Sequence, residues 1–373
     1  MKIRIEKNSF KNVLEKIQGM TSQKTSLQIT RNVIIETISD KEISVKATDL
    51  ISEYYCTMEA EIETKGIIAL NSKKFFDIVK YFPEDFIPIE EIDFQWIKIG
   101  TKDVYFHLVG ASPEDFPGIS LDFDSEFFDT NSNSFKKMLT AGNSINPEMN
   151  ELRTFILGIN ISFLNNKNFS SLKMFSTDTK RIIKTEIRSE SLIPEELNSK
   201  SVLLPKKVIS DLIKFIDQEK VSLSFTSELL ILKQGNEFYS VNVLEGDFPD
   251  CSGLVVPDHE YAIEIDKNIL NDTLQRVSIV ADDKIPIVFF NFSDNTLTLS
   301  SSNPELGEAK ESIGIKFEKE GFETAFNSRY ILNILKDIQD NSVILYLKDK
   351  SSHCIITGSE NLDYAAAIMP IKI

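Results

Sequence analysis

The feature of this chain that most restricts its fold is a helix start that recurs along its whole length. Six segments open with a capping residue or a proline and continue with apolar residues at helical spacing. Successive starts lie about 60–70 residues apart, which leaves room for several strands after each short helix. We therefore expect one helix-and-strand module to be repeated. The expected starts are Asn8, Asn71, Asn133, Pro205, Asp266 and Asn327.

The segments between these helices have the pattern of strands. Apolar and polar residues alternate, with many β-branched and aromatic side chains, over Val104–Leu108, Val221–Phe225 and Thr296–Leu299. Each expected helix carries one apolar stripe, to which Phe10 and Leu14 belong in the first helix. A striped helix must bury that face, so we expect the helices to cover sheets.

A longer period of about 130 residues lies on top of the first. Thr48-Asp49-Leu50 recurs as Thr177-Asp178-Thr179, and an Asp-Phe-Pro turn ending at Pro117 recurs at Pro249. Asp49 and Asp178 could be paired carboxylates of an enzyme, but a repeated Thr-Asp favours a turn role. We predict an α+β chain of three repeated domains, each with two helices and two small antiparallel sheets. Their predicted bounds are 1–121, 122–256 and 257–373.

The charge of the chain is unevenly distributed between the two kinds of element. The net charge of −16 argues against nucleic acid when taken as a total, because phosphate binding needs clustered Lys and Arg. The six helical segments nevertheless sum to about +8, so the signs are segregated. Lysine is a good helix former, which could explain one basic helix. Six such helices in an acidic chain favour binding of a polyanion. Among the helix cations we nominate Lys11, Lys73, Lys74, Lys136, Lys137, Lys206 and Lys207 as DNA contacts.

Simple geometry sets how many helices a ring around DNA would need. Helices packed side by side lie about 9 Å apart and are about 10 Å thick. Six of them would leave a hole of roughly 7 Å, whereas twelve would leave roughly 24 Å. We therefore expect two copies of the chain joined head to tail, with the helices lining the pore.

Composition excludes several other classes of protein. Cys56, Cys251 and Cys354 lie far apart, which argues against a disulfide framework or a paired-cysteine metal site. The three histidines lack metal-ligand spacing, and neither a Gly-rich phosphate loop nor a nucleophile elbow is present. No apolar run approaches the roughly 20 residues of a membrane span. We expect a soluble, cytoplasmic, non-catalytic protein without cofactor or metal and without a membrane partner.

Several short motifs, in this order, are similar to one known family from Met1 to Ile373. Together they resemble the bacterial DNA polymerase III beta subunits, the DNA sliding clamps. The motifs are Met1-Lys2-Ile3, Thr48-Asp49-Leu50, Lys74-Phe75-Phe76-Asp77, the two Asp-Phe-Pro turns, Thr177-Asp178 with Arg181, Asn303-Pro304-Glu305 and Met369-Pro370. The resemblance implies a head-to-tail homodimeric ring that slides on duplex DNA without reading bases and confers processivity on the polymerase.

The resemblance also implies two sets of contact residues. Lys24 and Asn150, in corresponding loops, would touch the DNA backbone, although Lys24 could equally be an ordinary exposed lysine. A hydrophobic cleft would bind short peptides of polymerase subunits, the clamp loader and repair proteins. The cleft residues would be Ile156, Thr177, Thr179, Lys180, Arg181, Ile182, Pro249, Leu254, His353, Ala367, Met369, Pro370, Ile371, Lys372 and Ile373.

At the cleft the chain departs from the usual family pattern. Thr179-Lys180-Arg181-Ile182 stands where members commonly have Gly-His-Arg-Leu, and the chain ends Ile371-Lys372-Ile373 instead of Met-Arg-Leu. A threonine in place of glycine should narrow the groove. The resemblance therefore does not determine which partner peptides the cleft prefers.

For the ring joint, the resemblance points to two edge strands. Residues 104–108 of one copy would meet residues 308–313 of the other, with apolar packing beside them. The interface residues would be Phe106, Leu108, Ile279, Val280, Glu308 and Glu311. Such alternating residues are also typical of ordinary core strands, and a repeat scaffold that binds proteins alone remains the alternative to a clamp.

Overall fold

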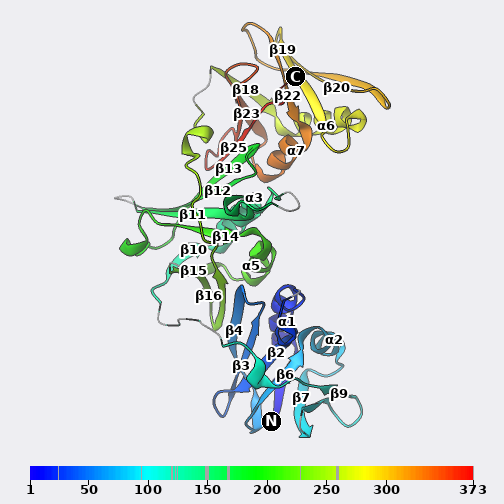
Figure 1. The fold of residues 1–373 in the computed structure, drawn as a ribbon, viewed down its shortest axis with the longest axis vertical. Coiled ribbons are helices and arrows are strands. Elements are labelled where there is room, and N and C mark those ends of the chain that lie inside the picture. Colours follow the sequence, from blue (N-terminus) through cyan, green and yellow to red (C-terminus); the bar gives the residue numbers. More distant parts are fainter. Residues whose placement is uncertain are drawn as a thin grey trace. The chain divides into compact units, whose positions relative to one another are not determined.

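A computed structural model describes residues 1–23, 25–93, 95–118, 121, 123, 125–147, 151–165, 169–226, 228–257 and 260–372. The chain divides into two compact units (Figure 1). Unit 1 contains Met1–Lys136, Ser189–Leu197 and Lys207–Leu244. Unit 2 contains Lys137–Arg188, Asn198–Lys206 and Glu245–Ile373. Each unit is built from antiparallel sheets and helices, as the α+β prediction requires.

Unit 1 holds a five-stranded and an eight-stranded sheet. The smaller has the order β5-β1-β7-β8-β9, and the larger the order β10-β15-β16-β17-β4-β3-β2-β6. The strands of the smaller sheet are β1 (Lys2–Glu6), β5 (Glu61–Thr64), β7 (Phe86–Asp93), β8 (Trp96–Gly100) and β9 (Tyr105–Val109). Those of the larger are β2 (Asn32–Thr37), β3 (Glu42–Thr48), β4 (Ser52–Glu59), β6 (Ile67–Asn71), β10 (Phe128–Asn131), β15 (Lys220–Phe225), β16 (Leu229–Gln234) and β17 (Glu237–Asn242).

Unit 2 repeats this plan with an eight-stranded and a four-stranded sheet. Their orders are β14-β11-β12-β13-β25-β24-β23-β18 and β21-β20-β19-β22. The strands of the larger sheet are β11 (Gly158–Asn165), β12 (Ser170–Thr177), β13 (Arg181–Arg188), β14 (Ser201–Pro205), β18 (Tyr261–Asp266), β23 (Ser342–Leu347), β24 (Cys354–Gly358) and β25 (Tyr364–Ile368). Those of the smaller are β19 (Ile287–Ser293), β20 (Thr296–Asn303), β21 (Gly307–Gly314) and β22 (Phe322–Asn327).

Each eight-stranded sheet crosses a boundary between sequence repeats. Strand β4 of the first repeat pairs with β17 of the second, placing Tyr54 opposite Tyr239. Strand β13 of the second pairs with β25 of the third, placing Ile183 opposite Ala366. The small sheets predicted for neighbouring domains are therefore joined into larger sheets at these junctions. Strand edges carry unpaired backbone donors and acceptors, and pairing with the next repeat satisfies them.

The six expected helices are all present, and a short seventh is added. They are α1 (Lys7–Thr21), α2 (Ser72–Tyr81), α3 (Ser132–Asn143), α5 (Ile209–Phe215), α6 (Lys267–Val277) and α7 (Ser328–Asp337), with α4 (Thr154–Leu157) as the addition. Asn71, Asp266 and Asn327 cap their helices with side-chain oxygens, as predicted.

Three predicted starts need correction. Helix α1 is capped by Glu6, whose carboxylate accepts the amides of Asn8 and Ser9 at 2.9 and 2.6 Å. The side chain of Asn131 accepts the amide of Ser134 at 3.0 Å, so α3 begins before Asn133. Pro205 ends strand β14, and a 3-10 turn over Lys206–Val208 precedes α5. Glutamate is not among the residues that usually cap helices, so the capping pattern did not indicate Glu6.

One backbone hydrogen bond occurs in all three repeats. The first residue of α1, α3 and α6 donates its amide to a carbonyl just beyond the second helix of the same repeat. The pairs are Lys7 to Asp85 at 2.8 Å, Ser132 to Glu219 at 3.0 Å and Lys267 to Asn341 at 2.8 Å. The repeated bond supports the period that the sequence predicted.

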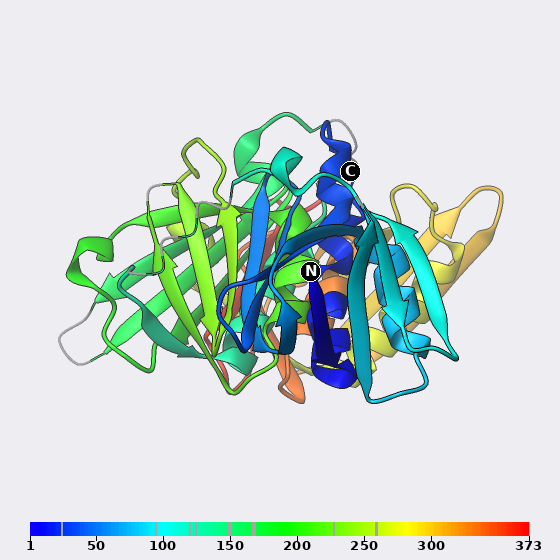
Figure 2. The same cartoon turned by 90° about the horizontal axis from the view of Figure 1, so that it is seen from below.

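In unit 1, helix α1 packs between the two sheets and against α2. Figure 2 shows the dark-blue α1 between the cyan strands of the smaller sheet and the blue and green strands of the larger. The Phe10 and Phe75 rings of α1 and α2 meet edge to face, with centroids 5.2 Å apart. Both rings are fully buried, so the predicted apolar stripes form the core.

A buried lysine joins α1 to the second repeat. Lys16 is 7% exposed, and its ammonium lies 2.8 Å from both Asp217 and Glu237. The Tyr54 hydroxyl donates to Glu237 at 2.8 Å and completes the network. Burial opposes the charge of Lys16, but its hydrogen bonds to Asp217 and Glu237 prevail and leave its pKa raised.

Replacing Lys16 with methionine is expected to lower the free energy of unfolding by about 2–3 kcal/mol, because it leaves two facing carboxylates without their cation. Urea unfolding at pH 7 measures the change. Lys11→Met, on the same helix, is the matched control and should change stability little. Adding Glu237→Gln to Lys16→Met should recover part of the loss. Equal effects of the two methionine substitutions would contradict this account.

Candidate functional site

Unit 2 contains an apolar cleft of about 180 Å³ beside the junction of β13 and β25. Thr177 ends β12, Thr179 lies in the turn before β13, and Met369 follows β25. Arg181 and Ile182 lie on β13. The full lining is Phe155, Thr177, Thr179, Lys180, Arg181, Ile182, Pro249, Cys251, Leu254, His353, Ala367 and Met369. Sequence segments far apart in the chain therefore converge on one cavity.

Most residues nominated for the peptide cleft do line this cavity, and several do not. Ile156 is buried behind it at 1% exposure, and its neighbour Phe155 lines the cavity instead. Cys251 also lines it, without having been nominated. Pro370, Ile371 and Lys372 line a separate groove, and Ile373 lies outside the described residues.

The floor of the cleft is a small hydrophobic cluster. Ile182 and Ala367 line the cavity and pack with Phe175, Val255 and Ile355, and Phe248 and Cys251 pack against them. Because these residues come from paired strands and the segment after the second Asp-Phe-Pro turn, the cavity has a rigid base. Met369 stands at its rim with half of its surface exposed. A flexible thioether at the rim suits varied apolar side chains.

The Thr-Asp turn before β13 holds one wall of the cleft. The Thr177 hydroxyl donates to the Arg181 carbonyl at 2.8 Å, and the amide of Arg181 donates to Asp178 at 3.0 Å. The turn at Thr48 and Asp49 has the same bonds, which confirms the turn role over a catalytic pair. The Arg181 guanidinium also bonds Asp178 at 3.0 Å.

Thr179 occupies a backbone position that favours glycine. Its φ is +73°, the same value that Leu50 has in the turn of the first repeat. A β-branched side chain is strained in this left-handed region. Glycine, which family members commonly have at this position, adopts this backbone conformation without strain. In this chain the turn is kept with a strained Thr179. Its side chain adds a methyl and a hydroxyl to the cleft wall.

Lys206, nominated as a DNA contact, is buried. It is 6% exposed, and its ammonium has no hydrogen-bond partner within the described part of the chain. Burial lowers its pKa to about 8; the nearby Asp178 opposes this shift and Arg181 adds to it. A lysine in this position cannot reach a phosphate, so the nomination is wrong. Its neighbour Lys207 is exposed.

Unit 1 presents a groove of about 690 Å³ along α1, α2 and α5. Lys11 and Lys80 line it from α1 and α2, and Lys214 lines it from α5. Lys16 lines it as well, but its charge is matched by Asp217 and Glu237. Lys16 belongs to one of the six helical segments that the sequence analysis found to be basic. Its partners lie hundreds of residues away, so the spacing of residues along the helix does not reveal them.

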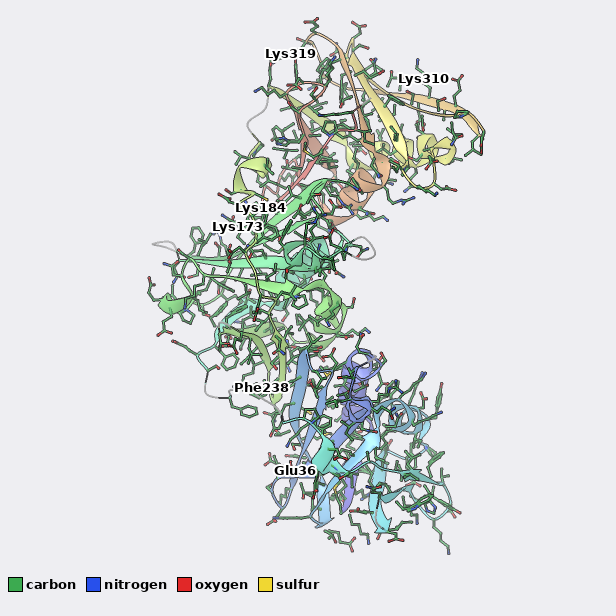
Figure 3. All side chains as sticks on the ribbon, in the orientation of Figure 1. Glu36, Lys173, Lys184, Phe238, Lys310 and Lys319 are labelled. Carbon is green, nitrogen blue, oxygen red and sulfur yellow. The ribbon has the colours of Figure 1, made fainter. Side chains whose placement is uncertain are left out.

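Several lysines on strands have carboxylate partners. On β12 and β13, Lys173 and Lys184 lie near one another (Figure 3), 3.8 and 3.3 Å from Glu186. Lys46 pairs with Glu36 at 2.6 Å. By contrast, the nominated helix lysines that are exposed form no ion pair within the described residues. They are Lys73, Lys74, Lys137 and Lys207.

The remaining DNA nominations have different surroundings. Lys11 and Lys136 are half-buried on α1 and α3. Lys24 and Asn150 lie outside the described residues.

The strands nominated for the ring joint are both sheet edges. In unit 1, β9 pairs with β8 alone and exposes Phe106, whereas Leu108 is half-buried. In unit 2, β21 pairs with β20 alone. Beside it Ile279 is 76% exposed and Val280 is half-buried. Glu308, on β21, is exposed.

Glu311 on β21 is already engaged within its own chain. Arg276 of α6 donates to its carboxylate at 2.6 and 2.9 Å, and Thr273 donates at 3.1 Å. The Arg276 bond, together with the weaker Thr273 bond, lowers the pKa of Glu311. Any contact that Glu311 makes with a second copy would therefore share this carboxylate with Arg276.

Two searches of the described residues gave no site of another kind. No helix there is long and apolar enough to cross a membrane. No group of three or more His, Cys, Asp or Glu side chains there could hold a metal ion.

Comparison with known proteins assigns all three repeats to one family. Residues 1–121, 130–250 and 254–372 match the N-terminal, central and C-terminal domains of the DNA polymerase III beta subunit. The beta sliding clamp of Chlamydia pneumoniae is 28% identical over 383 residues, covering 100% of this chain and 99% of that protein. The beta sliding clamp of Escherichia coli is 22% identical over 376 residues, covering 100% of both.

Solved structures share the fold. The DNA polymerase sliding clamp of Pseudomonas aeruginosa, determined with a ligand, matches with a TM-score of 0.91 at 21% identity and covers 100% of both chains. The clamp of Bacillus subtilis matches equally well, with 99% of that chain covered. The architecture is thus that of a three-domain clamp. This chain belongs to the DNA polymerase III beta subunit family and serves as a sliding clamp in DNA replication.

Replacing Lys206 with methionine is expected to raise the free energy of unfolding by about 1–3 kcal/mol at pH 7, because a buried ammonium without a partner is removed. The folded pKa of about 8 lies below the ordinary 10.5, so the unaltered protein gains stability as the pH rises from about 8 to 10.5. The advantage of the variant should therefore shrink over that range. Urea unfolding at pH 7 and pH 10 measures both effects.

The control for this substitution is Lys207→Met, at the exposed neighbouring position. It should change stability little at either pH. A variant of Lys206 that is less stable than the unaltered protein at pH 7 would show that this ammonium has a stabilising partner.

Proposed function

We propose that two copies of this chain close head to tail into a ring that encircles duplex DNA and tethers polymerases to it. The observation that carries the proposal is a set of exposed, unpaired lysines in a strongly acidic protein. Lys73, Lys74, Lys137 and Lys207 have no carboxylate partner among the described residues, whereas several strand lysines have one. Cations left unpaired are available to phosphates, and acidic sheets would repel DNA from other surfaces.

The proposed contacts with DNA are sequence-independent. Lysine ammonium groups act as point charges toward phosphates, which carry no base information. Lys73 and Lys74 on α2, Lys137 on α3 and Lys207 in the turn before α5 would approach the backbone. Lys24 and Asn150 are proposed on family resemblance alone. Retention on DNA then comes from closure of the ring, and the chain has no catalytic role of its own. We propose that it acts in the cytoplasm, where the bacterial chromosome is replicated.

The proposed ring joint pairs β9 of one copy with β21 of the other. Both strands have a free edge, so their pairing would extend two sheets into one across the interface. Phe106 and the exposed Ile279 would be buried beside that ladder. The apolar area and the backbone bonds together favour a dimer that is stable in solution.

The cleft of unit 2 is proposed to bind the apolar anchors of short peptides from polymerase subunits, the clamp loader and repair proteins. Its small volume, apolar floor and flexible Met369 rim suit one bulky side chain of an extended segment. A relative from Pseudomonas aeruginosa has been solved bound to griselimycin.

Once loaded onto nicked circular DNA by a clamp-loader complex, the protein should stay bound and should be lost after the circle is linearised.

The doubly substituted Lys73→Glu, Lys74→Glu protein should bind DNA more weakly in filter-binding assays. Its slope of log affinity against log salt should fall by about two. Lys41→Glu, Lys65→Glu, exposed in the same unit, is the matched control. Equal retention on linear and circular DNA, or a mass near 42.4 kDa at micromolar concentration, would rule out the ring.

Met369→Ala should weaken binding of a labelled polymerase peptide by about 5- to 30-fold, because the side chain supplies part of the cleft rim. Fluorescence anisotropy measures the change. The substitution tests the side chain more specifically than deletion of the tail would. Deletion would also remove the hydrogen bond from the Met369 amide to the Lys180 carbonyl, which is 2.9 Å long. Leu362→Ala, exposed in the same unit but away from the cleft, should leave affinity unchanged. Unaltered affinity of the Met369 variant would refute the assignment.

A further inference from the structure

On its helix side, each repeat junction carries an aspartate that faces the end of a helix from the preceding repeat. In unit 1, Asp211 of α5 lies against Gly19 in the last turn of α1, where its carboxylate leaves no room for a side chain. In unit 2, Asp337 of α7 lies within hydrogen-bonding reach of Ser144, which directly follows α3. The two aspartates therefore meet the same kind of helix end.

The two helix ends occupy equivalent positions in their repeats. The first residues of α1 and α3, Lys7 and Ser132, donate the backbone bond that recurs in all three repeats. Gly19 follows Lys7 at the same interval as Ser144 follows Ser132. The aspartates, by contrast, come from different positions, because one lies in the first turn of α5 and the other is the last residue of α7. The chain thus brings a carboxyl group to the same structural point twice, from two different positions.

Asp211 is unfavourably placed when it is ionised. It is 7% exposed, and the carbonyl groups at the end of α1 carry a partial negative charge that repels a carboxylate. Burial raises its pKa; Lys214 opposes this shift, and the nearby Asp49 adds to it. Lys214 lies 3.8 Å away and is exposed, so it offsets the burial only in part. The buried hydroxyl of Tyr239 on β17 is near the same two carboxyl groups.

The groups around Asp337 also offset its burial only in part. Burial raises the pKa of this half-buried carboxyl to about 6. Four neighbours act in the opposite direction, namely Ser144, Tyr364, Arg181 and Lys336. The Tyr364 hydroxyl donates from β25 at 3.4 Å, which is long for a bond to a carboxylate. Arg181 of β13 is itself bonded to Asp178 at 3.0 Å, and Lys336 is exposed.

The hydroxyl of Ser144 is committed to its own helix. It donates to the Ala141 carbonyl of α3 at 2.7 Å, so it could donate to Asp337 only by giving up this bond. A neutral carboxyl group can donate to the Ser144 oxygen, whereas an ionised carboxylate can only accept. The contact between Asp337 and Ser144 is therefore better satisfied when the aspartate carries a proton.

We propose that the Asp211–Gly19 and Asp337–Ser144 contacts are proton-sensitive latches between neighbouring repeats, tight when the aspartate is neutral and loosened when it is ionised. Asp337 is mostly ionised at neutral pH, because pH 7 lies above its pKa of about 6. The helix side of the second junction is then weakened, while the backbone pairing of β13 with β25 still joins the repeats. Such a junction can flex on its helix side without losing its strand pairing. The latches lie within one chain, so they act whether or not a ring forms.

The raised pKa values determine the sign of the effect. A carboxyl group whose pKa is higher in the closed latch than in the open one favours closure at low pH and loses this contribution as the pH rises. For Asp337 the two values are about 6 and the ordinary 3.8. The equilibrium constant for opening should therefore increase about 10-fold between pH 5 and pH 8.

Hydrogen exchange of the full chain, followed by mass spectrometry and corrected for intrinsic exchange rates, measures this opening. In the unaltered protein, the protection of the segments around Ser144 and Asp337 should fall about 10-fold from pH 5 to pH 8. Asp337→Asn keeps the shape of the side chain without its charge, so this variant should retain the protection at pH 8. Asp211→Asn should act in the same direction on the ends of α1 and α5 and leave α7 unchanged.

The matched controls are Asp77→Asn on α2 and Asp272→Asn on α6, which each remove an exposed helix carboxylate. They should alter protection at neither junction. Urea unfolding provides a second measurement. The advantage of Asp337→Asn over the unaltered protein should be present at pH 7.5 and absent near pH 4, where the native carboxyl group is neutral.

Protection of the two latch regions that stays constant or rises with pH in the unaltered protein would overturn the proposal, and this outcome does not depend on any variant folding. Lower protection in Asp337→Asn than in the unaltered protein at pH 8 would also overturn it, because the ionised carboxylate would then hold the latch closed. Equal effects of Asp272→Asn and Asp337→Asn would show that general charge removal is responsible.

Discussion

Backbone pairing between consecutive repeats is the interaction on which the rest of the architecture depends. Strand β4 meets β17, and β13 meets β25, so each eight-stranded sheet is completed by two repeats. A sheet edge left open in water invites pairing with other chains, and burying it unpaired is costly. Each junction removes one edge from each of the two sheets that it joins. The pairing also builds the apolar cleft, because Ile182 and Ala367 face each other across the second junction.

A buried ion network reinforces the first junction, whereas the second is mainly apolar. Lys16 of α1 bonds Asp217 and Glu237 of the second repeat. At the second junction the comparable contacts are Phe175, Ile182 and Ile355 in one cluster. Buried charges confer little net stability but demand one specific arrangement, while apolar contact tolerates adjustment. An apolar second junction suits the proposal that the cleft beside it accepts several kinds of side chain.

The sequence predicted the elements that depend on local chemistry. Asn71, Asp266 and Asn327 were found as caps, because a capping side chain bonds amides two or three residues away. The Thr-Asp turns were predicted for the same reason. The one-residue error at Ile156 is also local: α4 is a single turn, and its phase decides whether Phe155 or Ile156 faces the cavity. Pattern alone cannot fix the phase of so short a helix.

Burial of charge could not be predicted in this way, because it depends on partners distant in sequence. Lys16 and Lys206 look like the half-buried Lys11 and the exposed Lys207 in any window of the sequence. Yet Lys16 is matched by Glu237, 221 residues away, and Lys206 is enclosed without a hydrogen-bond partner among the described residues. Counting helix lysines therefore overstates the charge available to DNA. The proposed DNA contacts rest instead on Lys73, Lys74, Lys137 and Lys207, which are exposed.

The placement of charge also explains how an acidic protein can hold DNA without binding it tightly. Phosphate contacts by isolated lysines are individually weak and are screened by salt. Strong attraction would fix the protein at one position, whereas unpaired lysines on several helices give many equivalent, short-lived contacts. A ring converts such contacts into long residence, because dissociation then requires opening and not merely the loss of ion pairs. Weak local affinity and topological closure are therefore complementary requirements for sliding.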